Sequence, residues 1–306
     1  MTMAKQIRSW LHEVTDEVTD VFGRELNIDS TGVSARNVEG WQPRAASWTA
    51  IVAVFVIGWA QGTLIALRIA LGSERAPATR PTSSISDLVL SILQDGAIAA
   101  IAVALIWAFR QYSGARPVRA SWRVNLKTFF LAIDAMALGW LAQGIVAQAL
   151  TGMFGIPSYK PGPEQTTDLL THILTIADTA MAGPSEELAL MALVVVALHA
   201  TGYNRWVIVV VAILVRIPFH LYYGWSAIAL SVWVVLTILL YWRTGAIVGI
   251  ILAHTVWNVL LYLPYSINFV IKVVLVGIGF VVVCHRMGQL ESEYKVRQCQ
   301  RRDGNH

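Results

Sequence analysis

Long apolar stretches separated by short polar connections make up most of this chain of 306 residues. A stretch of about 20 apolar residues is long enough to cross a bilayer as a helix. The pattern predicts eight membrane-spanning segments, the fourth being a helix or helix pair broken near Gly183–Pro184. The segments cover residues 48–68, 88–109, 128–151, 168–200, 206–222, 226–242, 246–262 and 266–284. Very short connections join the last four, so we expect those helices to pack as antiparallel neighbours.

Polarity also divides the chain into four parts. Residues 1–47 are charged and mixed, and we expect them to form a cytoplasmic N-terminal segment. Residues 48–152 hold the first three predicted spans, and residues 168–265 hold four spans that carry ionisable side chains. The last span and a basic tail occupy residues 266–306. The predicted fold class is therefore an all-α, polytopic integral membrane helix bundle, with its functional core at 168–265.

Composition and charge agree with this class. Hydrophobic residues make up 56% of the chain and charged residues only 14%, against about 25% charged residues in soluble domains. The net charge of +4 comes from basic residues gathered in the N-terminal segment, the 110–127 loop and the tail. Because Lys and Arg are enriched in cytoplasmic loops, this asymmetry predicts that both termini are cytoplasmic. We expect the lipid bilayer and no nucleic acid as a partner, and the compact chain favours a bacterial cell membrane.

Polar side chains inside the predicted spans need a partner or a function, because an ionisable group at the centre of a membrane helix costs about 2.5–3.5 kcal/mol on insertion scales. Six such residues fall on three helices of the second half: Glu186 and Glu187, Arg216 and His220, and His254 and Asn258. Members of the last two pairs are four residues apart and share a helix face. Adjacent glutamates lie about 100° apart around a helix axis. One can therefore face a site while the other takes a structural partner.

Together these side chains suit hydrolysis of an acyl bond. A glutamate near a histidine can act as a general base on water. A His–Asn pair can bind a substrate oxygen or stabilise an oxyanion. Alternatively, a glutamate and two histidines can bind a divalent metal such as zinc and activate water. Both interpretations stay open on these residues alone, and in both a peptide bond is the natural substrate inside a membrane cavity.

Other intramembrane peptidase chemistries leave weaker signals. The chain has no His-Glu-x-x-His for a zincin and no Gly-x-Gly-Asp for an aspartyl type. The sequence GWSA at 224–227, with His254 one helix later, resembles the rhomboid serine–histidine arrangement. That interpretation places Ser226 at a tight turn between helices and leaves the two glutamates unexplained. We therefore favour a glutamate-based site.

Three short motifs on successive helices resemble the CPBP family, which includes type II CAAX prenyl endopeptidases and bacteriocin-processing or self-immunity proteins. The matching stretches within about 168–265 are EELALM, RIPFH and HTVWN. The resemblance implies an α-helical intramembrane endopeptidase in which Glu186 activates water and His220 is its partner. It also implies that His254 and Asn258 contribute to oxyanion binding or metal ligation. The implied substrate is a membrane-embedded or prenylated peptide or protein.

Two positions depart from the family pattern. Met191 stands where the first motif has an arginine, and Arg216 stands where the second motif has an aromatic residue. We expect Arg216 to supply, from the next helix, the cation that Met191 cannot provide. Paired with Glu187 in this way, it would leave Glu186 free for chemistry.

Two other classes of function stay open. An altered first motif is compatible with a catalytically silent CPBP-like scaffold or a bacteriocin immunity protein. Intramembrane glutamate, histidine and arginine also form proton relays, as in a proton-coupled transporter. Transporters more often show repeated halves, and the sequence has no visible repeat.

Overall fold

The structure is a computed structural model that describes residues 41–73, 83–114, 120–156 and 168–303, with side chains described as far as residue 284. In these parts of the chain all regular structure is helical and no strand occurs, as predicted. The helices are α2 (Gln42–Ala70), α3 (Ile85–Ser113), α4 (Trp122–Phe154), α5 (Leu169–Glu186), η1 (Glu187–Ala192), α6 (Leu193–Ala200), α7 (Arg205–His220), η2 (Leu221–Tyr223), η3 (Trp225–Leu230), α8 (Ser231–Thr244), α9 (Ile247–Val259), η4 (Leu260–Tyr262) and α10 (Tyr265–Asp303).

Seven helical segments within these described residues are long and apolar enough to cross a membrane. The remaining predicted span is the shorter apolar helix Ile247–Tyr262. All eight predicted apolar segments are therefore helical, and the helix bundle of an integral membrane protein is confirmed as the fold class. Most of the predicted N-terminal segment lies outside the described residues. The predicted basic tail continues the last span as part of α10.

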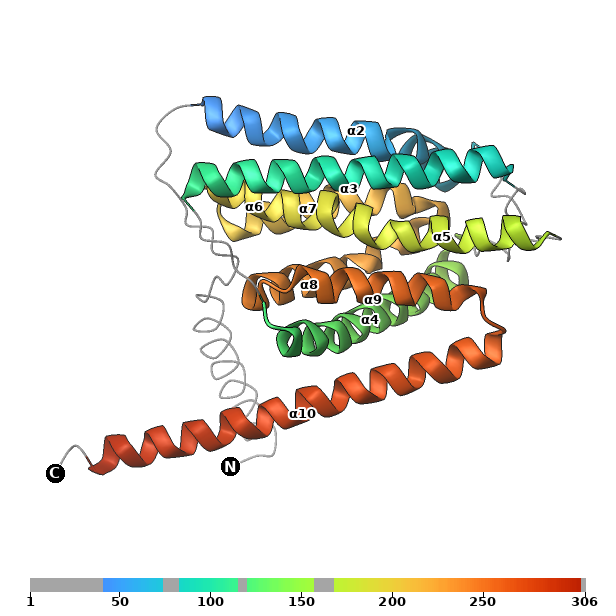
Figure 1. Cartoon of the computed structure of the whole chain (residues 1–306). Coiled ribbons are helices and arrows are strands. Elements are labelled where there is room, and N and C mark those ends of the chain that lie inside the picture. The colour runs from blue at the N-terminus through green and yellow to red at the C-terminus, as the bar shows by residue number, and fades with distance from the viewer. Residues whose placement is uncertain (1–40, 74–82, 115–119, 157–167, 304–306) are drawn as a thin grey trace.

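The helices run roughly along one direction, in layers (Figure 1). Helices α2, α3 and α5 to α7 lie on one side, while α4, α8 and α9 lie on the other. The contacts between α5 and α9 and between α7 and α8 join the two sides. Helix α10 packs on α4 at the edge of the bundle (Figure 1). The segment that carries the candidate chemistry thus lies between both sides.

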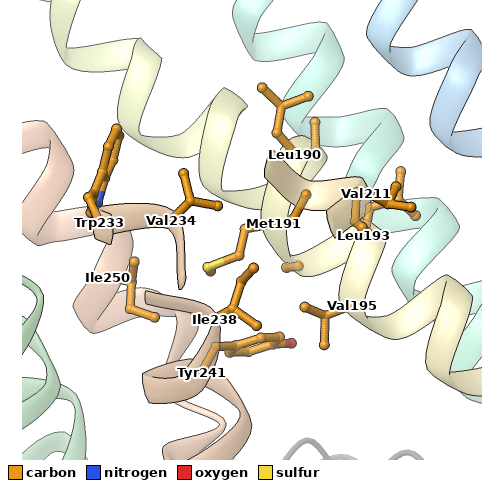
Figure 2. Packing of buried hydrophobic residues seen from close by; sticks show 14 of the residues in the cluster. Leu190, Met191, Leu193, Val195, Val211, Trp233, Val234, Ile238, Tyr241 and Ile250 are labelled. Carbon is orange, nitrogen blue, oxygen red and sulfur yellow. The ribbon is translucent and has the colours of Figure 1, made fainter. Parts of the chain in front are cut away.

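The helix that runs from Leu169 to Ala200 is the centre of the bundle. In its most apolar window 72% of the residues are buried, against 6% in the window of the last span. A helix that is apolar all round is suited to a core position. Figure 2 shows the middle of this core, where Met191 lies among Val234, Ile238 and Ile250. Methionine at this position is fully buried in apolar surroundings.

The predicted break at Gly183–Pro184 does not occur, because the chain stays helical through both residues. Proline has no backbone N–H, so the carbonyl of Ala180, four residues back, lacks its helical donor. The hydroxyl of Thr255 on α9 donates to that carbonyl at 3.2 Å. Gly183 permits this approach, since a Cβ there would lie 2.9 Å from the backbone nitrogen of Thr255. The Gly-Pro pair therefore brings α9 against α5.

The irregularity appears instead at η1, a single stretch of π helix that begins at Glu187. Such stretches are uncommon and are frequent at functional sites. The π turn starts directly after Glu186, so the two adjacent glutamates lie on either side of the change in helical geometry.

Candidate active site

A buried polar cluster joins three helices at the start of the π helix. Arg216 of α7 donates to Glu187 from Nη2 to Oε1 at 2.6 Å and from Nη1 to Oε2 at 3.2 Å. Nδ1 of His254, on α9, lies 2.8 Å from Oε1 of Glu187. The exposed fractions of the three side chains are 1%, 0% and 5%. Since an unpaired charge in such a place is strongly destabilising, each group depends on the others.

The hydrogen bonds assign the proton on the near nitrogen of His254. A carboxylate only accepts, so Nδ1 donates to Glu187. Nη2 of Arg216 also lies 3.4 Å from this Nδ1, but a nitrogen that donates to one group does not accept from another. The shorter contact therefore decides the arrangement, and Nε2 of His254 stays available on the other side of the ring.

The adjacent glutamates have different surroundings, as expected. Glu186 lines a cavity, whereas Glu187 is fully buried behind it. The expected contact between Arg216 and Glu187 is present. The expectation that this pairing leaves Glu186 without a cationic partner is wrong, because Nη2 of Arg216 also donates to Oε2 of Glu186 at 3.2 Å and orients both carboxylates. Oε2 of Glu186 makes this contact with Arg216, and the Glu186 side chain is 11% exposed.

His220 ends α7 and faces the same cavity. Its Nδ1 lies 3.0 Å from the carbonyl oxygen of Arg216. A carbonyl only accepts, so Nδ1 carries the proton in this bond and Nε2 is left without a partner in the described part of the chain. Asn258, one turn after His254 on α9, also lines the cavity. No described residue hydrogen-bonds its carboxamide.

The cavity has a volume of about 230 Å³ and brings together side chains of α3, α4, α5, α8, α9 and the end of α7. All four residues predicted to be catalytic contribute to its lining. Nε2 of His220 and Nε2 of His254 have no hydrogen-bond partner among the described residues, yet neither atom is inaccessible. Both atoms therefore face this cavity. The lining residues are Ser91, Asp95, Met136, Trp140, Asp178, Thr179, Ala182, Glu186, His220, Tyr222, Tyr223, Leu230, Trp233, His254, Trp257, Asn258 and Leu261.

The arrangement does not fit a zinc ion. No group of three or more His, Cys, Asp or Glu side chains in the described residues is placed to hold a metal. The positive charge between the two glutamates is that of the Arg216 guanidinium, which contacts both carboxylates. A divalent cation at this place would meet that guanidinium at close range, and like charges in a buried site repel strongly.

The rhomboid-like alternative also finds no support in the geometry. Ser226 is 2% exposed, and its hydroxyl donates to the carbonyl of Tyr223 at 3.4 Å. It does not line the cavity that Glu186 and the two histidines face. The serine therefore belongs to the turn that starts η3.

In a comparison with known protein families, residues 168–260 match the family described as type II CAAX prenyl endopeptidase Rce1-like. Residues 168–260 form an Rce1-like domain. This confirms the family that the three motifs indicated. No curated protein and no solved structure matches the chain.

The Rce1-like domain contains every predicted site residue, but not every residue of the site. Ser91 and Asp95 of α3, and Met136 and Trp140 of α4, come from the spans that precede the domain. Sequence reasoning missed their role, because which face of α3 or α4 meets the domain depends on packing. The first spans thus close the cavity of the Rce1-like domain.

Trp233 on α8 was missed within the Rce1-like domain itself. The guanidinium carbon of Arg216 lies 4.2 Å from the centre of its ring, and the His254 ring meets it edge-on at 5.1 Å. A cation over a tryptophan face is stabilised, more so where water is excluded. Tryptophan is common in membrane helices, so the sequence carries no signal that singles out this one.

Proposed function

We propose that this protein is an intramembrane endopeptidase that hydrolyses a peptide bond of a membrane-associated substrate with a glutamate-activated water. One observation carries the proposal: Glu186 opens on the cavity while Arg216 and His254 hold Glu187 behind it. Membership of residues 168–260 in the Rce1-like family supports peptidase chemistry. The family description names a prenyl endopeptidase, so a membrane-embedded or prenylated peptide is the proposed substrate.

In this proposal Glu186 accepts a proton from water as the water oxygen attacks the carbonyl carbon of the scissile bond. A positioned general base contributes about 10²–10⁴-fold to rate. His220, whose Nε2 faces the same cavity, is the partner that exchanges protons with Glu186. The proton taken from water then passes to the leaving amine as the carbon–nitrogen bond breaks.

His254 and Asn258 are the proposed oxyanion-binding pair. The carboxylate of Glu187 accepts from Nδ1 of His254 and orients the ring so that Nε2 faces the cavity. Because Nδ1 already carries a proton in this bond, Nε2 donates to the oxyanion when the ring carries both protons. The carboxamide of Asn258 stands one helical turn away, on the same face of α9. Donors aimed at the developing negative charge typically contribute about 10²–10³-fold each.

The test uses the full-length protein purified in detergent and a quenched fluorescent peptide library. We expect cleavage that persists in the presence of a chelator and falls by about 10²–10⁴-fold in Glu186→Gln, which is nearly isosteric but cannot accept the proton. Asp134→Asn is the matched control, because this carboxylate lies within α4 and does not line the cavity.

Three results would contradict the proposal. Cleavage that survives Glu186→Gln removes the role of this carboxylate. Cleavage abolished by the chelator indicates metal chemistry. Failure to cleave any library peptide, with the protein folded, favours the catalytically silent scaffold.

A further inference from the structure

The cavity has an acidic wall beyond the proposed catalytic residues. Asp95 of α3 and Asp178 of α5 both line it together with Glu186. Asp178 and Glu186 are eight residues apart, so they share one face of α5. At 1.5 Å per residue, the wall extends about 12 Å from Glu186 toward the beginning of α5. Asp95 lies close to Ser185, Glu186 and Asp178, so this wall begins beside the carboxylate that Arg216 contacts.

Carboxyl groups outnumber cations around the cavity. The charge of Arg216 is engaged by Glu186 and Glu187. Neither Asp95 nor Asp178 forms an ion pair with a cation in the described residues. Oδ1 of Asp178 is buried without a hydrogen-bond partner. Ser185 hydrogen-bonds the Asp95 side chain, but a charged group within a membrane protein also calls for a partner of opposite charge, and no cation of the described residues pairs with either aspartate.

Two buried histidines of the proposed catalytic set also present polar atoms to this cavity, which suits a polar ligand. His220 and His254 are 9% and 4% exposed, and each presents an unpartnered Nε2 to the cavity. The volume of about 230 Å³ is below the ~300–1,000 Å³ of sites for drug-sized ligands. A short peptide segment with one long side chain suits this space.

We infer that Asp95 and Asp178 form a subsite for a cationic side chain, lysine or arginine, of a peptide substrate. The inference rests on the proposed peptidase function and specifies its substrate class. An ammonium or guanidinium group makes charge-assisted hydrogen bonds to carboxylates. An extended chain advances at most about 3.3–3.6 Å per residue, so a span of ~12 Å places the basic residue within about four residues of the scissile bond.

Binding tests the subsite separately from catalysis. Full-length Glu186→Gln protein in lipid nanodiscs is titrated with two fluorescein-labelled hexapeptide libraries that differ only in one fixed position, lysine or norleucine. We expect the lysine library to bind about tenfold more tightly, as a charged hydrogen bond predicts. Adding Asp95→Asn and Asp178→Asn should make the two affinities nearly equal.

Two further variants guard against a general loss of folding. Asp95→Glu with Asp178→Glu keeps both charges and should retain the preference for lysine. Asp134→Asn removes a carboxylate outside the cavity and should also retain it. Equal binding of the two libraries, or binding of neither, overturns the subsite, as does a lysine preference that survives both Asp→Asn changes.

Cleavage by the wild-type protein then distinguishes the two proposals. Binding that depends on lysine without cleavage by wild type overturns the peptidase function and leaves the cation subsite standing. Cleavage without any preference for lysine in binding overturns the cation subsite and leaves the peptidase function standing.

Discussion

Exchanging the side chains of Arg216 and Met191 tests whether the site is stabilised by a positive charge beside the buried carboxylate of Glu187. Arg216 contacts Glu187 from α7, whereas Met191 lies four residues after it in the same π helix. Both side chains are essentially inaccessible, with exposed fractions of 1% and 0%. The informative set is Arg216→Met, Met191→Arg and the double variant that combines them.

The structure sets the magnitudes. Arg216→Met leaves the fully buried carboxylate of Glu187 with His254 as its one remaining partner. Removing one partner of a buried ion pair costs about 3–5 kcal/mol. Met191→Arg alone puts a second cation into the apolar core of Figure 2, with a cost of similar size. In the double variant the introduced guanidinium is placed to pair with Glu187, so we expect the two costs to fall short of additivity by about 2 kcal/mol.

The free energy of unfolding in bicelles, measured with a chemical denaturant, completes this cycle. Arg205→Met is the control on the same helix. The half-buried Arg205 lies over the buried Trp242 ring at 5.7 Å, and such a contact contributes about 0.5–2 kcal/mol. Costs that add within ~0.5 kcal/mol refute the pairing. An Arg216→Met variant no less stable than Arg205→Met refutes it as well.

Other consequences concern helix contacts and topology. Thr255→Val removes the hydroxyl that donates to the Ala180 carbonyl, which Pro184 leaves without its helical donor, and should lower the free energy of unfolding by about 1–3 kcal/mol. This loss should shrink in a Pro184→Ala background. An unchanged loss contradicts the idea that Thr255 compensates for the proline. Gly139→Ala places a Cβ 2.6 Å from the Cβ of Trp233 on α8, whereas the control Gly144→Ala meets nothing within 4 Å. Gly139→Ala should therefore lower the free energy of unfolding by about 1–3 kcal/mol and also lower the peptidase rate. Equal effects of the two substitutions contradict the close packing of α4 against α8. With both native cysteines removed, Thr179→Cys should react with a membrane-impermeant maleimide from the non-cytoplasmic side. The cavity lies toward the start of α3 and the end of α9, and the predicted topology places both of these helix ends on that side. Labelling from the cytoplasm reverses the predicted topology.

Much of the architecture could be predicted from local sequence. All eight apolar segments are helices because a chain in lipid must satisfy its backbone hydrogen bonds within each segment. The candidate catalytic set was also visible, since Glu186, His220, His254 and Asn258 interrupt apolar runs where polar groups are costly. The structure places all four on one cavity. Their catalytic roles stay a prediction that the peptide assay tests.

The sequence was less informative wherever a residue's role depends on its neighbours across helices. The Gly183–Pro184 pair suggested a break, but Thr255 from α9 supplies the missing hydrogen bond and the helix continues. The cavity carboxylate Asp95 belongs to a span outside the Rce1-like domain, so no motif includes it.

By itself, the sequence determined which segments enter the membrane and which polar residues are exceptional there, because hydrophobic length and the cost of burying a charge are local properties. Only the tertiary structure decided how these charges are compensated. Arg216 and Glu187 are far apart along the chain and meet because α7 packs against the π helix. The division of labour between Glu186 and Glu187, and the acidic wall beyond them, therefore follow from which helix faces meet.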